Sequence, residues 1–323
     1  MKIKEVNYLP SGRIFLAETN DSYLIEFTEM RDVSIDGKVH KEVRETFDPK
    51  IVWKHLVPYK DKWLLTVSTQ KGCAFNCSFC DVAPLEFKGN LLQEEIEDQI
   101  KLILVSTPYV TKTSKAKIGF ARMGEPAMNL DNVLNAMKNL PLISKELNRE
   151  ISWLPCFNTI VPKASPNTIE KVIDLKENIY NGHLHFQISC NSTNEETRHK
   201  LFNTDKIFSL EEIIHQVNKF KISNRTITLN FIVMEDVEVS VEKLKKLGLS
   251  KEKFSVKLIP LNSTNNANRN NLKTYANYSN YERLLTLKDT FEKEGIPVIV
   301  DAIAQCEEGG LCCGQLAQCS MDK

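Results

Sequence analysis

Three cysteines lie close together in one short segment, Cys73-Ala-Phe-Asn-Cys77-Ser-Phe-Cys80, directly after a segment of strand character. Thiolates at this spacing can converge on one metal centre in a tight loop. Ordinary iron–sulfur clusters take four cysteines, so three with no local fourth would leave one iron open to another ligand. The alternative is a structural zinc site completed by a distant Cys or His, but zinc ligands usually come as two separated pairs. The C-x3-C-x2-C spacing therefore favours a cluster over zinc.

Polar residues follow several later segments of strand character. Gly124-Glu125-Pro126 comes after the second such segment, Ser189 ends the fourth, and Asn262 follows the sixth. Sites in β/α barrels are built at the carboxyl ends of the strands, where a carboxylate could accept a charge-assisted hydrogen bond from a ligand ammonium. Each of these residues could also belong to a plain turn, because Gly, Pro, Asn and Ser are turn formers.

Strands and helices are predicted to alternate from residue 63 onward. Strands are expected at 64–68, 118–121, 151–157, 184–188, 226–233 and 254–259, each followed by apolar residues at helical spacing. Ser165-Pro166 and the capping box Ser209/Glu212 predict two helix starts. Six strand–helix units in a row predict an α/β fold with a parallel sheet, curled into a full or partial (β/α)6 barrel; a doubly wound sheet is the alternative. The Asn-rich segment 262–271 is expected to be an exposed loop.

The first 60 residues have a different pattern. Tyr23, Ile25 and Phe27 alternate with Leu24, Glu26 and Thr28, as in a strand. Asp36-Gly37 lies between two short segments of strand character, which predicts a hairpin. The sequence is therefore divided into a small β-rich N-terminal appendage (1–60), the barrel (61–303) and a Cys-rich C-terminal tail (304–323) that reaches the active site.

Composition narrows the class of protein. The 323 residues carry 42 Lys+Arg and 42 Asp+Glu, which excludes a generic polyelectrolyte binder of nucleic acid. No stretch approaches the roughly 18 apolar residues of a membrane span, and the N-terminus has no apolar signal segment, so a cytoplasmic location with no membrane partner is expected. Nine cysteines in a reducing compartment indicate metal ligands or reactive thiols. Cys156 and Cys190, which stand alone, are expected to be small buried residues.

Several of these segments together resemble the radical SAM superfamily and, more narrowly, its rRNA adenine C2/C8 methyltransferases. The matching segments run in family order from about 63 to 317: the cysteine triplet at 72–80, Met123-Gly124-Glu125-Pro126, Ile188-Ser189 with 194–198, 258–262, and Cys313-Gly314-Gln315-Leu316. The triplet is specific to the superfamily. The combination of Gly-Glu-Pro with a C-terminal Cys-Gly-Gln-Leu is specific to the methyltransferases.

The resemblance implies an enzyme with a [4Fe-4S] cluster, held by Cys73, Cys77 and Cys80, whose open iron binds S-adenosylmethionine. Reductive cleavage of that molecule would give a 5′-deoxyadenosyl radical. The residues that would line the S-adenosylmethionine site are Gly124, Glu125, Ser189, Asn191 and Asn262. Cys313 would lie near the substrate as a catalytic residue. The implied partners are an electron donor of the flavodoxin or ferredoxin type and an RNA or smaller nucleotide substrate.

The sequence also departs from the family pattern. Thr66 stands where the methyltransferases have a second cysteine, and Trp53 stands where they have a glutamate proposed as a base. The family's Ser-Leu-His segment reads Ser189-Cys190-Asn191, and the helical N-terminal RNA-binding module is replaced by β-rich sequence. We therefore expect that methyl transfer to adenine is altered.

Two other functions remain open, a radical reaction on a small molecule or peptide without methyl transfer, and a non-catalytic binding module stabilised by zinc. The four tail cysteines could together hold a second metal, or those other than Cys313 could be incidental; the four are Cys306, Cys312, Cys313 and Cys319.

Overall fold

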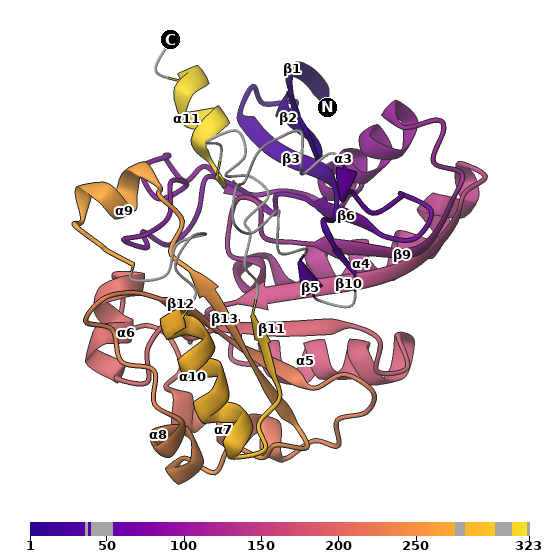
Figure 1. Cartoon of the computed structure of the whole chain (residues 1–323). Coiled ribbons are helices and arrows are strands. Elements are labelled where there is room, and N and C mark those ends of the chain that lie inside the picture. The colour runs from indigo at the N-terminus through magenta and orange to yellow at the C-terminus, as the bar shows by residue number, and fades with distance from the viewer. Residues whose placement is uncertain (36–37, 40–53, 275–281, 301–311, 322–323) are drawn as a thin grey trace. The chain divides into compact units, whose positions relative to one another are not determined.

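The computed structural model describes residues 1–35, 38–39, 54–274, 282–300 and 312–321 (Figure 1). Contacts divide the chain into two compact units. The first unit consists of Met1–Ala74, Asp81–Cys156 and Gln305–Lys323, and the second consists of Phe75–Cys80 and Phe157–Ala304. None of the helices in the described residues is long and apolar enough to cross a membrane.

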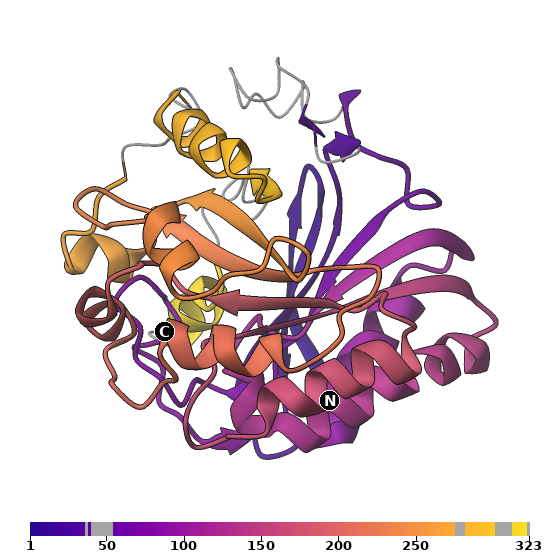
Figure 2. The same ribbon diagram turned by 90° about the horizontal axis from the view of Figure 1, so that it is seen from below.

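The first unit contains one sheet in which antiparallel strands continue into parallel ones. Its strands, in spatial order, are β1 (Lys2–Leu9), β2 (Gly12–Glu18), β3 (Leu24–Arg31), β6 (Trp63–Thr66), β9 (Lys112–Gly119) and β10 (Glu150–Thr159), the last of which runs on into the second unit. β1, β2 and β3 run side by side, indigo to violet in Figure 2, and β3 pairs antiparallel with β6. β6, β9 and β10 pair in parallel. The N-terminal strands therefore extend the sheet of the parallel strands; the domain boundary at residue 60 stays a prediction.

The hairpin expected in the N-terminal segment has its paired strands. β4 (Ser34–Ile35) pairs antiparallel with β5 (Lys38–Val39), while the turn residues 36–37 lie outside the described residues.

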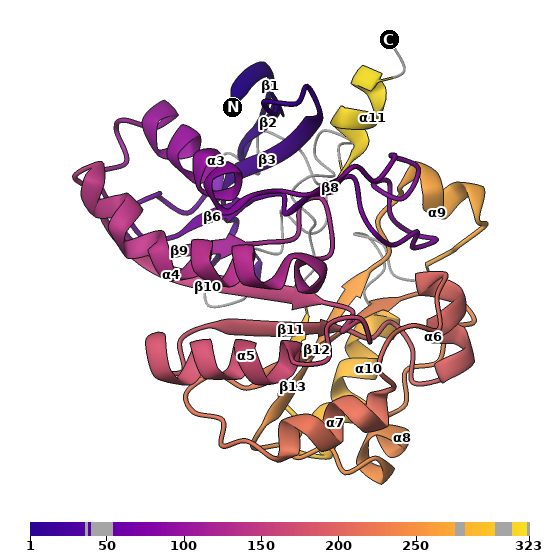
Figure 3. The same ribbon diagram turned by 180° about the vertical axis from the view of Figure 1, so that it is seen from behind.

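Two amphipathic helices cover one face of the parallel strands of the first unit, as Figure 3 shows. They are α3 (Gln93–Ser106) and α4 (Leu130–Glu146). Their apolar residues at helical spacing are buried, among them Ile96, Ile100 and Met137. The helical stripes predicted from the sequence are thus the core-facing sides of these helices.

The second unit continues the alternation with parallel strands. β11 (His185–Ser189), β12 (Ile227–Val233), β13 (Phe254–Pro260) and β14 (Val298–Val300) pair in that order. The helices are α5 (Thr168–Asp174), extended by the π-helical turn η2 (Leu175–Ile179), then α6 (Glu195–Phe202), α7 (Leu210–Asn218), α8 (Val241–Lys246), α9 (Asn265–Arg269) and α10 (Glu282–Lys293). The predicted order of six strand–helix units is confirmed over the two units.

Helix starts were predicted with mixed success. The capping box of α7 is present, since Ser209 Oγ accepts from Glu212 N and the Glu212 carboxylate accepts from Ser209 N. The start at Ser165-Pro166 is wrong, because α5 begins two residues after Pro166 and the Ser165 carbonyl instead accepts from Thr168 N in a turn. The Asn-rich loop is also corrected, since residues 265–269 form helix α9, capped by Thr264.

Candidate functional site

The cysteine triplet lies between β6 and α3, and its three side chains are half-buried. Cys73 belongs to the first unit, whereas Cys77 and Cys80 belong to the second. Within the described parts of the chain, no group of three or more His, Cys, Asp or Glu side chains is arranged to hold a metal ion. Shared ligation by the three thiols therefore rests on their spacing and on the chemistry of thiolate donors.

In the first unit, Gln70 links the start of the cysteine loop to the Gly-Glu-Pro segment. Its Oε1 accepts from Ala74 N at 3.2 Å and from Glu125 N at 2.9 Å, and its Nε2 donates to Asn90 Oδ1 at 2.7 Å. Gly124 has a φ of +100°, and a Cβ there would lie 2.6 Å from two side-chain carbons of Gln70. Only glycine fits this close approach. The sequence analysis missed Gln70, whose role depends on contacts 55 residues apart.

Glu125 is both a turn residue and a buried carboxylate. It is 6% exposed, and its Oε1 accepts from Ala127 N at 3.0 Å as the cap of the 3-10 helix η1 (Pro126–Asn129). The turn considered for this segment is therefore present. Because a carboxylate has several acceptor positions, this cap leaves Glu125 able to accept from a ligand as well.

In the second unit, the rest of the cysteine loop is anchored by apolar packing and by its own backbone. Phe75, Cys77 and Phe79 pack against a buried cluster, whose members are Ile160, Phe202 and Ile207. The rings of Phe79 and Phe202 meet edge to face at 5.9 Å. Ser78 donates through both N and Oγ to the carbonyl of Leu201, at 2.9 and 3.0 Å. These contacts fix the conformation of the loop.

Helix α9 and its cap hold the same loop through its carbonyl oxygens. Thr264 Oγ1 donates to the carbonyl of Phe79 at 2.8 Å, Asn266 Nδ2 to that of Cys77 at 2.9 Å, and Asn270 Nδ2 to that of Ser78 at 3.0 Å. Three successive carbonyls are thus bound by one short segment. We refer to residues 264–270 as the Asn clip.

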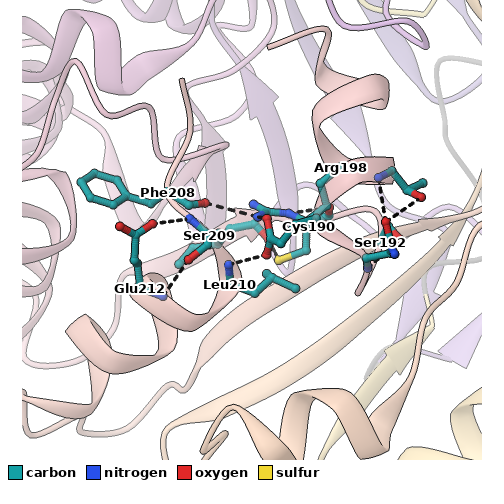
Figure 4. A network of polar contacts seen from close by, with 11 residues as sticks. Cys190, Ser192, Arg198, Phe208, Ser209, Leu210 and Glu212 are labelled. Carbon is teal, nitrogen blue, oxygen red and sulfur yellow. Dashed lines mark hydrogen bonds and ion pairs between the residues drawn. The ribbon is translucent and has the colours of Figure 1, made fainter. Parts of the chain in front are cut away.

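The loop that follows β11 is held by a buried arginine, as Figure 4 shows. Arg198 is 0% exposed. Its Nε donates to the carbonyl of Cys190 at 3.2 Å, and its Nη1 contacts the carbonyl of Phe208 at 3.2 Å and Glu195 Oε2 at 2.6 Å. Ser192 Oγ further along the loop accepts from Asn194 N at 3.1 Å. The segment that carries Ser189 and Asn191 therefore has a fixed backbone.

Asn191 provides an observation that points to a ligand. It is 1% exposed and has a φ of +61°, and its Oδ1 accepts from Ile232 N at 3.2 Å. Its Nδ2, like Asn230 Oδ1 on the neighbouring strand, is buried without a hydrogen-bond partner in the described chain. Buried polar atoms are nearly always paired, so a donor and an acceptor left over here fit a polar ligand. The assignment of Asn191 to an S-adenosylmethionine site stays a prediction.

The other predicted residues of this site lie at strand ends. Ser189 is the last residue of β11, and Asn262 follows the end of β13; both are half-buried. Cys190, between Ser189 and Asn191, is fully buried, and burial raises the pKa of its thiol to about 12. Cys156 is also buried, so the expectation that these two cysteines are small buried residues is confirmed.

The C-terminal cysteines differ in their surroundings. Cys312 is 5% exposed, Cys313 is half-buried with Arg122 Nη1 3.5 Å from its sulfur, and Cys319 is exposed on α11 (Gln315–Met321). Thr66, at the position of the family's second cysteine, shares a hydrogen bond of 2.5 Å with the hydroxyl of Thr28. The positions of Cys306 and Trp53 lie outside the described residues.

Comparisons with known proteins give relatives in sequence and in structure, although no family model matches the chain. The dual-specificity RNA methyltransferase RlmN of Campylobacter hominis is 30% identical over 247 residues, which cover 71% of this chain and 65% of that protein. A probable dual-specificity RNA methyltransferase RlmN of Pseudothermotoga lettingae is 29% identical over 262 residues, with 80% and 72% covered. The chain spans only 60 to 65% of the length of several such relatives.

A solved structure has the same fold. The crystal structure of a radical SAM methyltransferase from Sphaerobacter thermophilus superposes with a TM-score of 0.69 at 20% identity, covering 97% of this chain and 80% of that one. This likeness confirms the predicted fold class, a partial (β/α)6 barrel with additional N-terminal β strands.

Proposed function

We infer that this chain, which is related in sequence and fold to the RlmN-type radical SAM methyltransferases, is a radical SAM enzyme that modifies a nucleotide base, in RNA or in a smaller nucleotide. The observation that carries the proposal is the C-x3-C-x2-C loop between the first parallel strand and its helix. The buried amide Nδ2 of Asn191, which has no hydrogen-bond partner, also supports the proposal, because a polar ligand such as S-adenosylmethionine would accept its hydrogen bond.

Two sets of residues would hold the two cofactors. Thiolates of Cys73, Cys77 and Cys80 would hold a [4Fe-4S] cluster. The residues that would hold S-adenosylmethionine are Gly124, Glu125, Ser189, Asn191 and Asn262. When bound and reduced by a flavodoxin- or ferredoxin-type donor, this pair supplies a 5′-deoxyadenosyl radical.

The protein's own contribution is binding and orientation. Glu125 would accept from an ammonium group while its Oε1 also accepts from Ala127 N as the cap of η1. Asn191 would donate through Nδ2 while its Oδ1 remains bound to Ile232 N. Because both side chains are bonded to the protein, each is oriented before the ligand arrives, which reduces the entropy lost on binding.

We propose that the chain does not complete methyl transfer by two cysteines, because Thr66 stands at the position of the second cysteine. The hydroxyl of Thr66 is bound to Thr28 and is a far weaker nucleophile towards sulfur than a thiolate. Cys312 is adjacent to Cys313, and neighbouring residues lie closer than the roughly 4.4–6.8 Å Cα separation of ordinary disulfides. We therefore propose a radical modification that does not use this pair of cysteines, with Cys313 near the substrate.

An anaerobic turnover experiment tests the reaction. Reconstituted protein would be incubated with a reductant, S-adenosylmethionine labelled in the methyl group, and RNA fragments that contain the family's target adenine. 5′-Deoxyadenosine without methyl label in the RNA is the expected outcome. Several equivalents of methyladenosine per enzyme would refute the altered chemistry, and iron-loaded protein that forms no 5′-deoxyadenosine would refute radical SAM catalysis.

A variant tests the cofactor independently of activity. Replacing Cys73, Cys77 and Cys80 together by alanine should remove the iron and the broad visible absorbance, whereas the exposed Cys319→Ala should retain both. Iron retained in the triple variant would contradict the ligand assignment. Zinc in place of iron in the native protein would instead support the non-catalytic binding module.

A further inference from the structure

A buried ion pair joins β3 to the segment after β9 in the first unit. Arg122 Nη2 lies 2.5 Å from Glu26 Oε2, and the two side chains are 3% and 0% exposed. Taking two charges out of water costs several kcal/mol, and replacing such a pair by apolar residues is often neutral or stabilising. Stability alone is therefore a weak explanation for this pair, and its other contacts need to be considered.

The guanidinium of Arg122 also binds the C-terminal segment. Its Nη1 donates to Cys313 Sγ at 3.5 Å, and its Nη2 donates to the carbonyl of Cys312 at 3.3 Å. The planar guanidinium thus contacts a carboxylate, a carbonyl and a sulfur at fixed directions, which an uncharged apolar side chain would not reproduce.

The carboxylate of Glu26 binds the same segment from its other side. Its Oε2 accepts from Gly314 N at 3.1 Å, and its Oε1 accepts from Ala317 N at 2.8 Å. These amides lie at the start of α11, which packs beside β3 (Figures 1 and 3). Cys313 is therefore held on two sides, because Arg122 donates to its sulfur and Glu26 accepts from the amide N–H of the next residue, Gly314.

A third contact reaches the end of the cysteine loop. Gln315 Nε2 donates to Asp81 Oδ2 at 2.5 Å, and Gln315 Oε1 accepts from Cys312 N at 2.5 Å. Gly314 has a φ of +89°, and a Cβ there would lie 2.8 Å from Val82 N. The chain around Cys313 is thus pressed against the two residues that directly follow Cys80.

We propose that Arg122 and Glu26 are positioning residues that dock residues 312–317 and hold the Cys313 thiol in place. Only the catalytic role of Cys313 rests on the proposed function; the docking follows from the contacts above. In this arrangement the cysteine has a guanidinium beside its sulfur, a setting that favours a reactive thiolate.

Differential alkylation of the full-length, cluster-loaded protein under anaerobic conditions tests the docking. Iodoacetamide labelling at each cysteine would be followed by mass spectrometry. In the native chain the exposed Cys319 should react fast and the buried Cys312 slowly. In Arg122→Met, labelling of Cys312 should rise at least about tenfold, because protection reflects how rarely the segment opens. Cys156 and Cys190, both buried elsewhere, report global unfolding and should stay protected.

Two further variants keep the test decisive. Arg122→Lys restores the positive charge beside Glu26 and should recover most of the protection of Cys312. If Arg122 only filled space, methionine would do so as well, and lysine would give no more protection than methionine. Glu26→Gln/Arg122→Met removes both charges, so a labelling pattern like that of Arg122→Met shows that docking, and not one unpaired charge, was lost. If Arg122→Met unfolds, the double variant and Arg122→Lys carry the test.

The proposal is overturned if Cys312 stays as protected in Arg122→Met as in the native chain, or if methionine and lysine give the same labelling. Formation of 5′-deoxyadenosine is measured separately on the same samples. Failure of the docking with cleavage intact, or the reverse, therefore distinguishes this inference from the proposed function.

Discussion

Replacing Asn191 by alanine should weaken both the fold and the binding of S-adenosylmethionine. The substitution leaves the half-buried N–H of Ile232 without its acceptor, which costs about 1–3 kcal/mol of the free energy of unfolding. It also places alanine at a φ of +61°, at a further cost of about 1–2 kcal/mol. If the ligand pairs with Nδ2, losing that bond should raise its Kd by about 5- to 150-fold, the equivalent of about 1–3 kcal/mol.

Two measurements separate these effects. Urea unfolding gives the stability, and calorimetric titration of cluster-loaded protein with S-adenosylmethionine gives the affinity. Asn203→Ala is the matched control, because Asn203 has a φ of +51° but is exposed, so that variant shows the backbone cost alone and should bind the ligand normally. An Asn191→Ala protein that is destabilised as expected but binds S-adenosylmethionine as tightly as the native chain would refute the role of the unpaired amide.

Three more outcomes are expected. Asn270→Ala, which removes one bond of the Asn clip worth about 0.5–1.5 kcal/mol, should speed the loss of iron to a chelator, whereas Asn268→Ala on the exposed side of the same helix should not. Gly124→Ala should lower the melting temperature well beyond Gly89→Ala, because both have positive φ but a Cβ at Gly89 meets nothing within 4 Å. Burial raises the pKa of Cys190 to about 12 from 9.0, so the unfolded chain loses this proton first and stability should fall as pH rises from 9 towards 12; in urea titrations, Cys190→Ala should lack this part of the decline.

The fold could be predicted where short sequence patterns determine the local structure. The capping box of α7 and the order of strands and helices could be recognised because each depends on residues a few positions apart. The Asn-rich segment was misjudged since asparagine is a weak helix former, and α9 is held by bonds from its side chains to a loop nearly 190 residues earlier in the chain. The start of α5 was misplaced by two residues, an error typical of helix boundaries.

The candidate site was predictable only in part. Cysteine spacing and the Gly-Glu-Pro segment could be read directly, but the contacts of Gln70 and Arg122 join parts of the chain that no local pattern connects. Glu26 illustrates the difficulty, because the structure buries its carboxylate completely and nothing in the sequence around it indicates this. Its charge is balanced by Arg122, 96 positions away in the chain, and strand periodicity cannot reveal such a partner.

The Asn clip has a thermodynamic consequence for the two proposed cofactors. Asn262 comes two residues before Thr264, so one continuous backbone segment would serve the ligand of Asn262 and also hold the carbonyls of the cysteine loop. Whichever group binds first would bear the cost of ordering this segment, and the second would then bind with that cost already met. Such linkage is reciprocal, so S-adenosylmethionine would slow the release of iron by the same factor by which the cluster tightens its binding. In variants of the Asn clip this coupling would weaken, so that the affinity for S-adenosylmethionine would depend less on the cluster and the release of iron less on S-adenosylmethionine.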